Sequence, residues 1–199
     1  MEQHIEQNTN ASDSKNKQAV LRDRQKILRS CALGSFSIIL LGVLLHNAYF
    51  WTRPLQLLAI LSPVNESVWE HLKMAFWAVI VFSLIEYPVL WGSVTNYLFA
   101  KAVGVSLMIA CILIVFYSYT AYTGKSILWV DIGSFVLGAI LCQWTCWKLY
   151  RTNPLSRSLQ IGALVYLIIL ASLFAAFTYF PPELEIFRDH SSETSRLHN

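Results

Sequence analysis

The chain has 199 residues, of which 55% are hydrophobic and only 14% are charged. Because a soluble domain usually carries about 25% charged residues, this composition excludes an ordinary soluble fold. The formal net charge is only +3, with the basic residues beside the apolar runs, which is not the charge pattern of a nucleic-acid-binding protein. We therefore expect an all-α, polytopic transmembrane helix bundle in one domain, with membrane lipids and no nucleic acid among its partners.

Residues 1–29 are polar and mixed in charge, with asparagine, glutamine, serine and lysine prominent. A segment of this composition cannot bury enough apolar surface to fold alone, so we predict a disordered tail on the cytoplasmic side. Its last part, Val20 to Arg29, has the alternative of a short interfacial helix that continues into the membrane.

Five long apolar runs follow, and each approaches the roughly 20 residues that cross a hydrocarbon core of about 30 Å. They are residues 30–50, 74–91, 102–122, 126–147 and 158–180. The apolar stretch Leu55–Leu61 is too short to cross alone, and we interpret it as a re-entrant or interfacial segment, with a sixth crossing as the alternative. The bundle then covers residues 30–180, and residues 181–199 form an extracytoplasmic tail.

Lysine and arginine predict the orientation, because loops on the cytoplasmic side carry more of them. Of the fifteen basic residues, six lie in the N-terminal tail, one in the second connection and three in the fourth. A sixth crossing by Leu55–Leu61 would reverse the side of every later connection, and the excess of basic residues on one side would be lost. We therefore predict a multi-pass protein of the cell membrane with a cytoplasmic N-terminus and an extracytoplasmic C-terminus.

The second span begins with the polar sequence Ser-Pro-Val-Asn-Glu-Ser-Val-Trp-Glu-His-Leu-Lys, residues 62–73. Serine is a good N-cap and proline is favoured at the first helical position. We therefore predict a helix that starts at Pro63, with Ser62 as its N-cap, and ends near Trp91. Such a helix is longer than the hydrocarbon core is thick, so its polar first turns should stand in the interface or line a wet cavity.

Several ionisable groups come together on the extracytoplasmic face under this topology. His46 ends the first span, Glu66, Glu70 and His71 open the second, and Asp131 lies in the first turns of the fourth. Ionisable side chains in membrane segments are costly, and they mark a functional site by default. The convergence of these groups predicts a polar site there.

Two kinds of chemistry suit these residues. Imidazole and carboxylate are ligands for a divalent metal such as zinc, and we expect His46, His71 and Asp131 to be the ligands. The same groups suit acid–base chemistry, with His71 acting on water, Glu70 or Asp131 orienting its ring, and Ser67, one helical turn before His71, as a nucleophile. The plain alternative is a solvated helix start with its acidic residues near the positive end of the helix dipole.

Glu86 is a second ionisable residue of the second span, nearer its cytoplasmic end. It lies fifteen residues after His71, or roughly 22 Å along a helix, so the two residues do not share a site. We expect Glu86 to pair with Lys101 or to hydrogen-bond to Asn96. A proton relay in a transporter is the alternative.

Residues 65–73, with Leu45-His46 and residues 181–187, resemble a family of small bacterial multi-pass membrane proteins of unknown function that carry an N-E-S-x-W-E-H-x-K motif. The resemblance extends over most of residues 35–190 and implies a membrane fold without an established activity. Ser67 and His71 are also similar to the serine–histidine motif of the ceramidase and adiponectin-receptor superfamily of zinc-dependent membrane amidases. That superfamily uses a His-x-x-x-His pair on its last helix, whereas the last span here contains no histidine.

Two classes of function fit these observations. The first is an integral membrane protein with a polar His/Glu/Asp site at the extracytoplasmic face and no catalysis, such as a small transporter component or an accessory subunit. The second is a metal-dependent membrane hydrolase that acts on a lipid or another amphiphile. A homo-oligomer and an amphiphilic small-molecule ligand are compatible with both.

Overall fold

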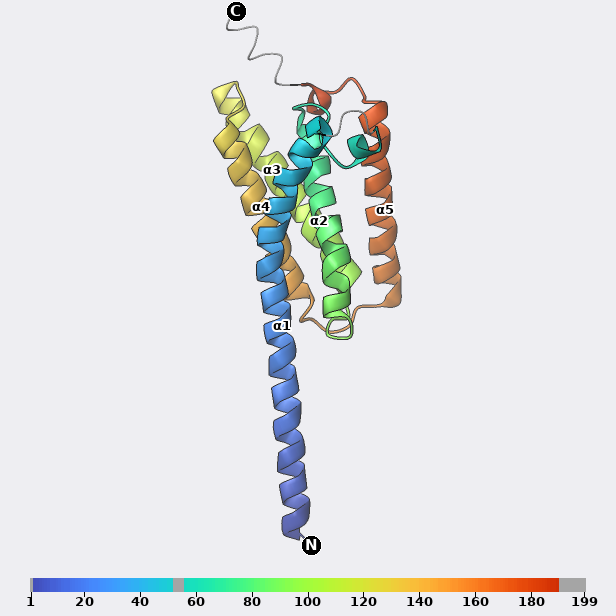
Figure 1. Cartoon of the computed structure of the whole chain (residues 1–199). Coiled ribbons are helices and arrows are strands. Elements are labelled where there is room, and N and C mark those ends of the chain that lie inside the picture. Colours follow the sequence, from blue (N-terminus) through green and yellow to red (C-terminus); the bar gives the residue numbers. More distant parts are fainter. Residues whose placement is uncertain (1, 52–55, 190–199) are drawn as a thin grey trace, which may run out of the picture.

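The computed structural model describes the backbone of residues 2–51 and 56–189, and the side chains from residue 16 onward apart from 49, 50, 56 and 57. Over these residues the protein is a bundle of long helices (Figure 1). The α-helices are α1 (Glu2–Trp51), α2 (Val68–Leu90), α3 (Tyr97–Thr123), α4 (Leu128–Leu149) and α5 (Arg157–Tyr179). Two 3₁₀ turns, η1 (Gln56–Ile60) and η2 (Glu185–Phe187), lie in the connecting and C-terminal segments.

The five predicted spans are confirmed, because each of the five α-helices contains a stretch long and apolar enough to cross a membrane. In α1 that stretch is Asn16–Ala48, and in the other helices it is the whole helix. The short segment before α2 is no sixth crossing in the part that the structure describes: η1 is a 3₁₀ helix of only five residues. Leu55 itself lies outside the described residues.

Helix α1 differs from the predicted disordered tail, because it is continuous from Glu2 (Figure 1). Residues 1–33 contain neither glycine nor proline, the two residues that most disfavour a helix. The polar residues of the tail therefore continue the helix of the first span in the N-terminal direction, beyond the rest of the bundle. This agrees with the alternative of a helix over Val20 to Arg29.

The helices pack in a defined order around the core. Helices α3 and α4 form the largest contact, α1 lies against α2 and α4, and α5 lies mainly against α3. Gly104 allows α3 to approach α4 closely, since a Cβ atom there would lie only 3.0 Å from the carbonyl oxygen of Cys142. Small residues have this role in membrane bundles, where close backbone approach replaces the hydrophobic effect as a source of stability.

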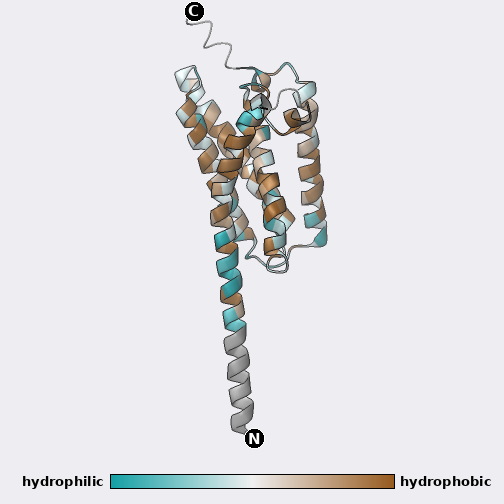
Figure 2. Cartoon of the chain, viewed as in Figure 1, coloured by the Kyte–Doolittle hydropathy of each residue, from teal (hydrophilic) through white to brown (hydrophobic). Residues whose placement is uncertain are grey.

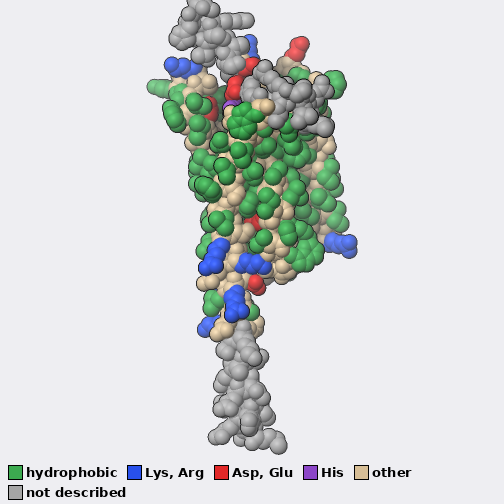
Figure 3. All heavy atoms as spheres, viewed as in Figure 1, with side chains coloured by type: hydrophobic (Ala, Val, Ile, Leu, Met, Phe, Trp, Pro, Cys, Tyr) green, Lys and Arg blue, Asp and Glu red, His purple; other side chains and the backbone are tan. Residues whose placement is uncertain are grey.

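The outer surface of the bundle carries a broad apolar band. Figure 2 shows hydrophobic residues along the bundle and hydrophilic ones on the part of α1 that leaves it, and Figure 3 shows the same band as a continuous hydrophobic surface. Exposed Leu33 and Phe36 of α1 and Ile168 of α5 belong to this band. Large exposed apolar surfaces on this scale are what a bilayer covers.

The two ends of the bundle differ in charge. We call one the basic end: it contains the 91–96 and 150–156 connections, and Lys and Arg side chains gather there (Figure 3). We call the other the histidine end, since it contains His46, His71 and the 58–67 loop. The aromatic ring of Phe187 in η2 packs 4.9 Å from that of Trp69. The described part of the predicted C-terminal tail is thus folded onto the histidine end, and residues 190–199 lie outside the described residues.

The predicted start of the second helix is wrong: α2 begins at Val68, with Ser67 rather than Ser62 as its N-cap. Side chains hold the preceding backbone in a non-helical path. The Asn65 amide oxygen accepts a hydrogen bond from the Ser67 N–H at 3.0 Å, and Glu70 accepts one from the Val64 N–H at 2.9 Å. Because side-chain bonds to nearby backbone compete with helix formation, the helix starts five residues later than predicted.

Candidate functional site

The histidine end brings two imidazoles to one carboxylate. His46 lies near the end of the α1 span, His71 in the first turn of α2, and Glu66 in the loop between them. His46 Nε2 is 3.9 Å from Glu66 Oε1, and His71 Nε2 is 3.4 Å from Glu66 Oε2. The two ring centroids are 5.6 Å apart. About a third of each histidine side chain and 42% of that of Glu66 remain exposed, so a small ligand can reach all three.

The orientation of His71 is defined by its other ring nitrogen. His71 Nδ1 lies 2.9 Å from the carbonyl oxygen of Ser67, and a carbonyl oxygen only accepts hydrogen bonds. Nδ1 therefore carries a proton, and in the neutral ring Nε2 presents its lone pair to the Glu66 carboxylate. Two electron-rich groups then face each other, an arrangement that is stabilised when a proton or another positive charge lies between them.

Glu70 and Lys73, the two other charged residues of the motif, pair with each other inside the protein. Lys73 Nζ is 2.5 Å from Glu70 Oε2, and both side chains are almost fully buried. Lys73 also donates to the carbonyl of Ala59 at 2.6 Å and to Thr178 Oγ1 at 2.9 Å. Since Glu70 also accepts from Val64, this pair connects the 58–67 loop, α2 and α5.

Ser67 has the contacts of a helix cap. Its hydroxyl accepts from the Glu70 N–H at 3.4 Å, whereas His71 bonds to its backbone carbonyl. Serine at the N-cap with glutamate three residues later is the capping-box pattern, and here the glutamate bonds not to the N–H of Ser67 but to that of Val64, three residues further back. These contacts are structural, and the catalytic roles of Ser67, Glu70 and His71 stay predictions.

Asp131 also lies at the histidine end, in the first turn of α4. Its carboxylate accepts a 2.6 Å hydrogen bond from the Tyr119 hydroxyl, which in turn accepts from the Ile127 N–H. Asp131 therefore helps to close the α3–α4 connection. Within the described residues no group of three or more His, Cys, Asp or Glu side chains is arranged to hold a metal ion, so the metal site at His46, His71 and Asp131 stays a prediction.

Glu66 is the site residue that sequence reasoning placed least well. On the predicted helix, which starts at Pro63, Glu66 would lie in the solvated first turn, on the same helix face as Glu70. Because the helix starts at Val68, Glu66 instead lies in the loop and faces the two histidines. The Ser67-x-x-Glu70 capping box is the signal in the sequence that marks this boundary.

A second polar cluster, which we call the buried centre, lies toward the basic end. Lys101 Nζ of α3 is 2.6 Å from Glu86 Oε2 of α2, as predicted. The same carboxylate accepts from the hydroxyls of Ser30 at 2.9 Å and of Tyr97 and Tyr150 at 3.2 Å each. Glu86 is 2% exposed and Lys101 1%. Four helices are joined at this one carboxylate.

Tyr150 enters the buried centre from just beyond the end of α4. Burial raises the pKa of its hydroxyl well above the ordinary value, and the nearby Cys146 and Glu86 raise it further. The hydroxyl therefore stays protonated and remains a donor to Glu86.

Asn96 is not the partner of Glu86 but holds the α4–α5 connection. Its Nδ2 donates to Thr152 Oγ1 and to the carbonyl of Asn153, both at 2.9 Å, and its Oδ1 accepts from the Leu155 N–H at 2.8 Å. Of the two partners predicted for Glu86, Lys101 is therefore the correct one.

Together, the five apolar helices and the polar groups at both ends of the bundle define a multi-pass helical membrane protein. The chain belongs to a family of unknown function, DUF6512, whose pattern matches residues 20–195. No curated protein matches the chain, and neither does any solved structure.

Proposed function

We propose that this protein binds a positively charged species, a proton or a divalent metal ion, at His46, Glu66 and His71, on the extracytoplasmic side of the membrane. Because these side chains are not arranged as metal ligands in the described residues, a metal ion would bind only after they move closer together. The observation that carries the proposal is the convergence of His71 Nε2, at 3.4 Å, and His46 Nε2, at 3.9 Å, on the two oxygens of the Glu66 carboxylate. Two imidazoles beside one carboxylate form a site where positive charge is favourable.

The extracytoplasmic placement is supported by the charge asymmetry of the bundle. Lys and Arg side chains gather at the basic end (Figure 3), and membrane proteins keep such residues on the cytoplasmic side. The histidine end then faces away from the cytoplasm. A site there would exchange ions with the external medium.

The contacts around the site favour binding or transport over hydrolysis. Of the residues considered for catalysis, Ser67 caps α2 and Glu70 is neutralised by Lys73. Both have structural bonds that a catalytic cycle would have to break. We therefore propose a transporter component or an accessory subunit rather than an enzyme that acts on a lipid or amphiphile.

Zinc titration calorimetry on the full chain in detergent at pH 7.5 tests this proposal. We expect one zinc ion per chain, with an affinity at least about tenfold lower in His71→Ala and in Glu66→Gln, each of which removes one ligand. Glu185→Gln is the matched control, because Glu185 is an exposed acid at the same end that pairs with Arg188. Protons compete with metal for imidazole, so binding should weaken at pH 5.5.

Two further measurements separate the alternatives. If Asp131→Asn binds zinc like the wild type, Asp131 is not a ligand. If zinc does not bind at all, NMR titration of the histidine rings tests the proton, and the His46 and His71 signals should shift together and respond to Glu66→Gln. The proposal would be refuted if zinc did not bind and if the titration of the histidine rings did not depend on Glu66.

A further inference from the structure

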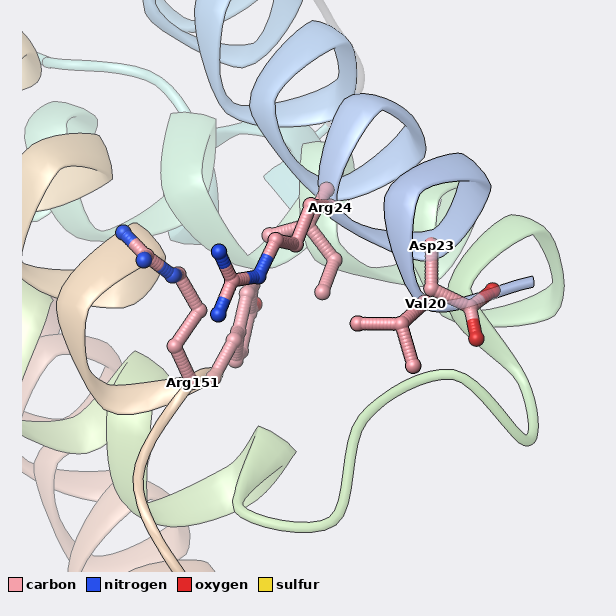
Figure 4. Close-up of a pocket in the computed structure, with 6 residues that line it drawn as sticks. Val20, Asp23, Arg24 and Arg151 are labelled. Carbon is pink, nitrogen blue, oxygen red and sulfur yellow. The ribbon is translucent and has the colours of Figure 1, made fainter. Parts of the chain in front are cut away.

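A cavity of about 220 Å³ lies at the basic end, between α1 and the C-terminal end of α4 (Figure 4). It has no part in the histidine site, which lies at the opposite end of the bundle. Its walls come from two segments of the chain, residues 20–27 of α1 and residues 150–151 just after α4. The lining residues are Val20, Asp23, Arg24, Ile27, Tyr150 and Arg151.

Two guanidinium groups dominate one side of this cavity. Figure 4 shows the side chains of Arg24 and Arg151 extending into the gap between α1 and α4, with Asp23 on the other side of the pocket. Asp23 is within hydrogen-bond distance of the Ser93 hydroxyl, at 3.2 Å. Arg151 is stacked on the ring of Trp147, 4.5 Å from its centroid, which fixes the position of its charge.

The floor of the cavity is apolar. Ile27 and Tyr150 are each 4% exposed, and the Tyr150 hydroxyl points away from the cavity to Glu86 in the buried centre. The cavity is therefore lined by the ring of Tyr150 and not by its hydroxyl group. A ligand that fits has a negatively charged part for the arginines and an apolar part for the floor.

The depth of the cavity in the membrane identifies the ligand further. It lies where the apolar band meets the basic residues, at the level where Lys148 covers the rings of Trp144 and Trp147. Tryptophan and basic residues mark the headgroup region of a bilayer. From this level the exposed apolar side chain of Leu28 leads toward the hydrocarbon core.

We propose that this cavity binds the phosphate of an anionic phospholipid of the cytoplasmic leaflet. Arg24 and Arg151 would donate charge-assisted hydrogen bonds to the phosphate oxygens, since guanidinium groups match phosphate geometry. The glycerol and the first part of the acyl chains would lie on Ile27 and the ring of Tyr150, on the side of the arginines that faces the hydrocarbon core. Bound in this way, the lipid connects α1 to the end of α4.

Native mass spectrometry of the detergent-purified full chain measures the binding of phosphatidylglycerol, phosphatidylcholine and inorganic phosphate. We expect phosphatidylglycerol to bind at least about tenfold more tightly than phosphatidylcholine, and the Arg24→Gln/Arg151→Gln variant to lose that preference. The control is Arg22→Gln/Arg157→Gln, which removes the same charge at the same end from residues outside the cavity. All four arginines are exposed, so both variants should fold.

Three results would overturn the proposal. Equal losses in the two double variants would show a general attraction of basic residues to anionic lipid. Equal binding of phosphatidylcholine and phosphatidylglycerol would show that headgroup charge is not recognised. Inorganic phosphate binding as tightly as phosphatidylglycerol would show a site for a free anion. The part of the tryptophan fluorescence that Trp147→Phe removes gives an independent readout, since Trp147 lies beneath Arg151, and it should change with phosphatidylglycerol in the wild type and the control only.

Discussion

Helix α2 and the loop before it place one carboxylate group toward each end of the bundle, and the two have opposite surroundings. Glu86, in the buried centre, receives one lysine and three hydroxyl groups from other parts of the bundle and is 2% exposed. Glu66, just before α2, faces two imidazoles at 3.4 and 3.9 Å and keeps 42% of its side chain exposed. One carboxylate is fully neutralised by the protein and the other is not.

This difference distinguishes stability from function among the charged residues. A buried charge has to be paired and hydrogen-bonded, because an unpaired one is expensive in a medium of low dielectric constant. Glu86 with Lys101, and Glu70 with Lys73, satisfy this rule within the protein. Glu66, by contrast, is exposed enough to exchange its positive partner with the solvent.

The largest effect on stability is expected from breaking the buried centre. Lys101→Met should lower the free energy of unfolding by about 4 kcal/mol, because it leaves the Glu86 carboxylate buried without a cation. Titration with a denaturing detergent measures this loss. Glu86→Gln/Lys101→Met should recover most of it, since no unpaired charge remains. A double variant as unstable as Lys101→Met would show that the pair itself, and not its charge balance, is needed.

Breaking the second pair is expected to cost less. Lys73→Met removes the partner of Glu70 and the bonds to Ala59 and Thr178, and should lower the free energy of unfolding by about 3 kcal/mol. The loss is smaller because the 58–67 loop can open and admit water to Glu70. Hydrogen exchange should then increase at the amide of Val64, which donates to Glu70. Unchanged exchange in this loop would contradict the proposed connection to α2.

The parts of the fold that the sequence predicts well are those marked by long sequence patterns. The five spans follow from runs of about twenty apolar residues, and all five are present. The pairing of Glu86 with Lys101 was also predictable, because Glu86 is an isolated charge in the second span and Lys101 lies just before the third span, at the same end. A membrane span can be identified from its own composition without knowledge of the segments it contacts, so tertiary packing does not change the prediction.

The site was less predictable, since it depends on where one helix starts. Serine followed by proline at 62–63 and the capping box at 67–70 are both start signals, and only one is used. The choice is made by bonds from Asn65 and Glu70 to backbone amides, together with the bond from the Ser62 hydroxyl to the carbonyl of Leu45 in α1. This last contact crosses seventeen residues, and no local pattern reveals it.

Ser67→Ala tests the capping role directly. Removing the hydroxyl from the N-cap should lower the free energy of unfolding by about 1 kcal/mol, measured by the same detergent titration. Zinc binding at His46, Glu66 and His71 should persist, because His71 bonds to the backbone carbonyl of residue 67. Ser67→Asp, which keeps an N-cap acceptor, should restore stability. Loss of binding in Ser67→Ala without loss of stability would instead indicate a chemical role for the hydroxyl.

The smallest effect on stability is expected at Glu66, although this residue matters most for the proposed function. Glu66→Gln should change the free energy of unfolding by less than about 0.5 kcal/mol, because exposed ion pairs contribute little. Its binding of zinc or protons should nevertheless fall by about tenfold or more, as one charged partner is lost.

Glu70→Gln, four residues away, should do the reverse: it should destabilise the protein by about 3 kcal/mol, because Lys73 is left unpaired, and keep the binding site once folded. The contrast between two glutamates of one motif therefore tests the division between a structural and a functional carboxylate. If both variants lost stability and binding together, the histidine site and the Glu70–Lys73 pair would have to be treated as a single unit.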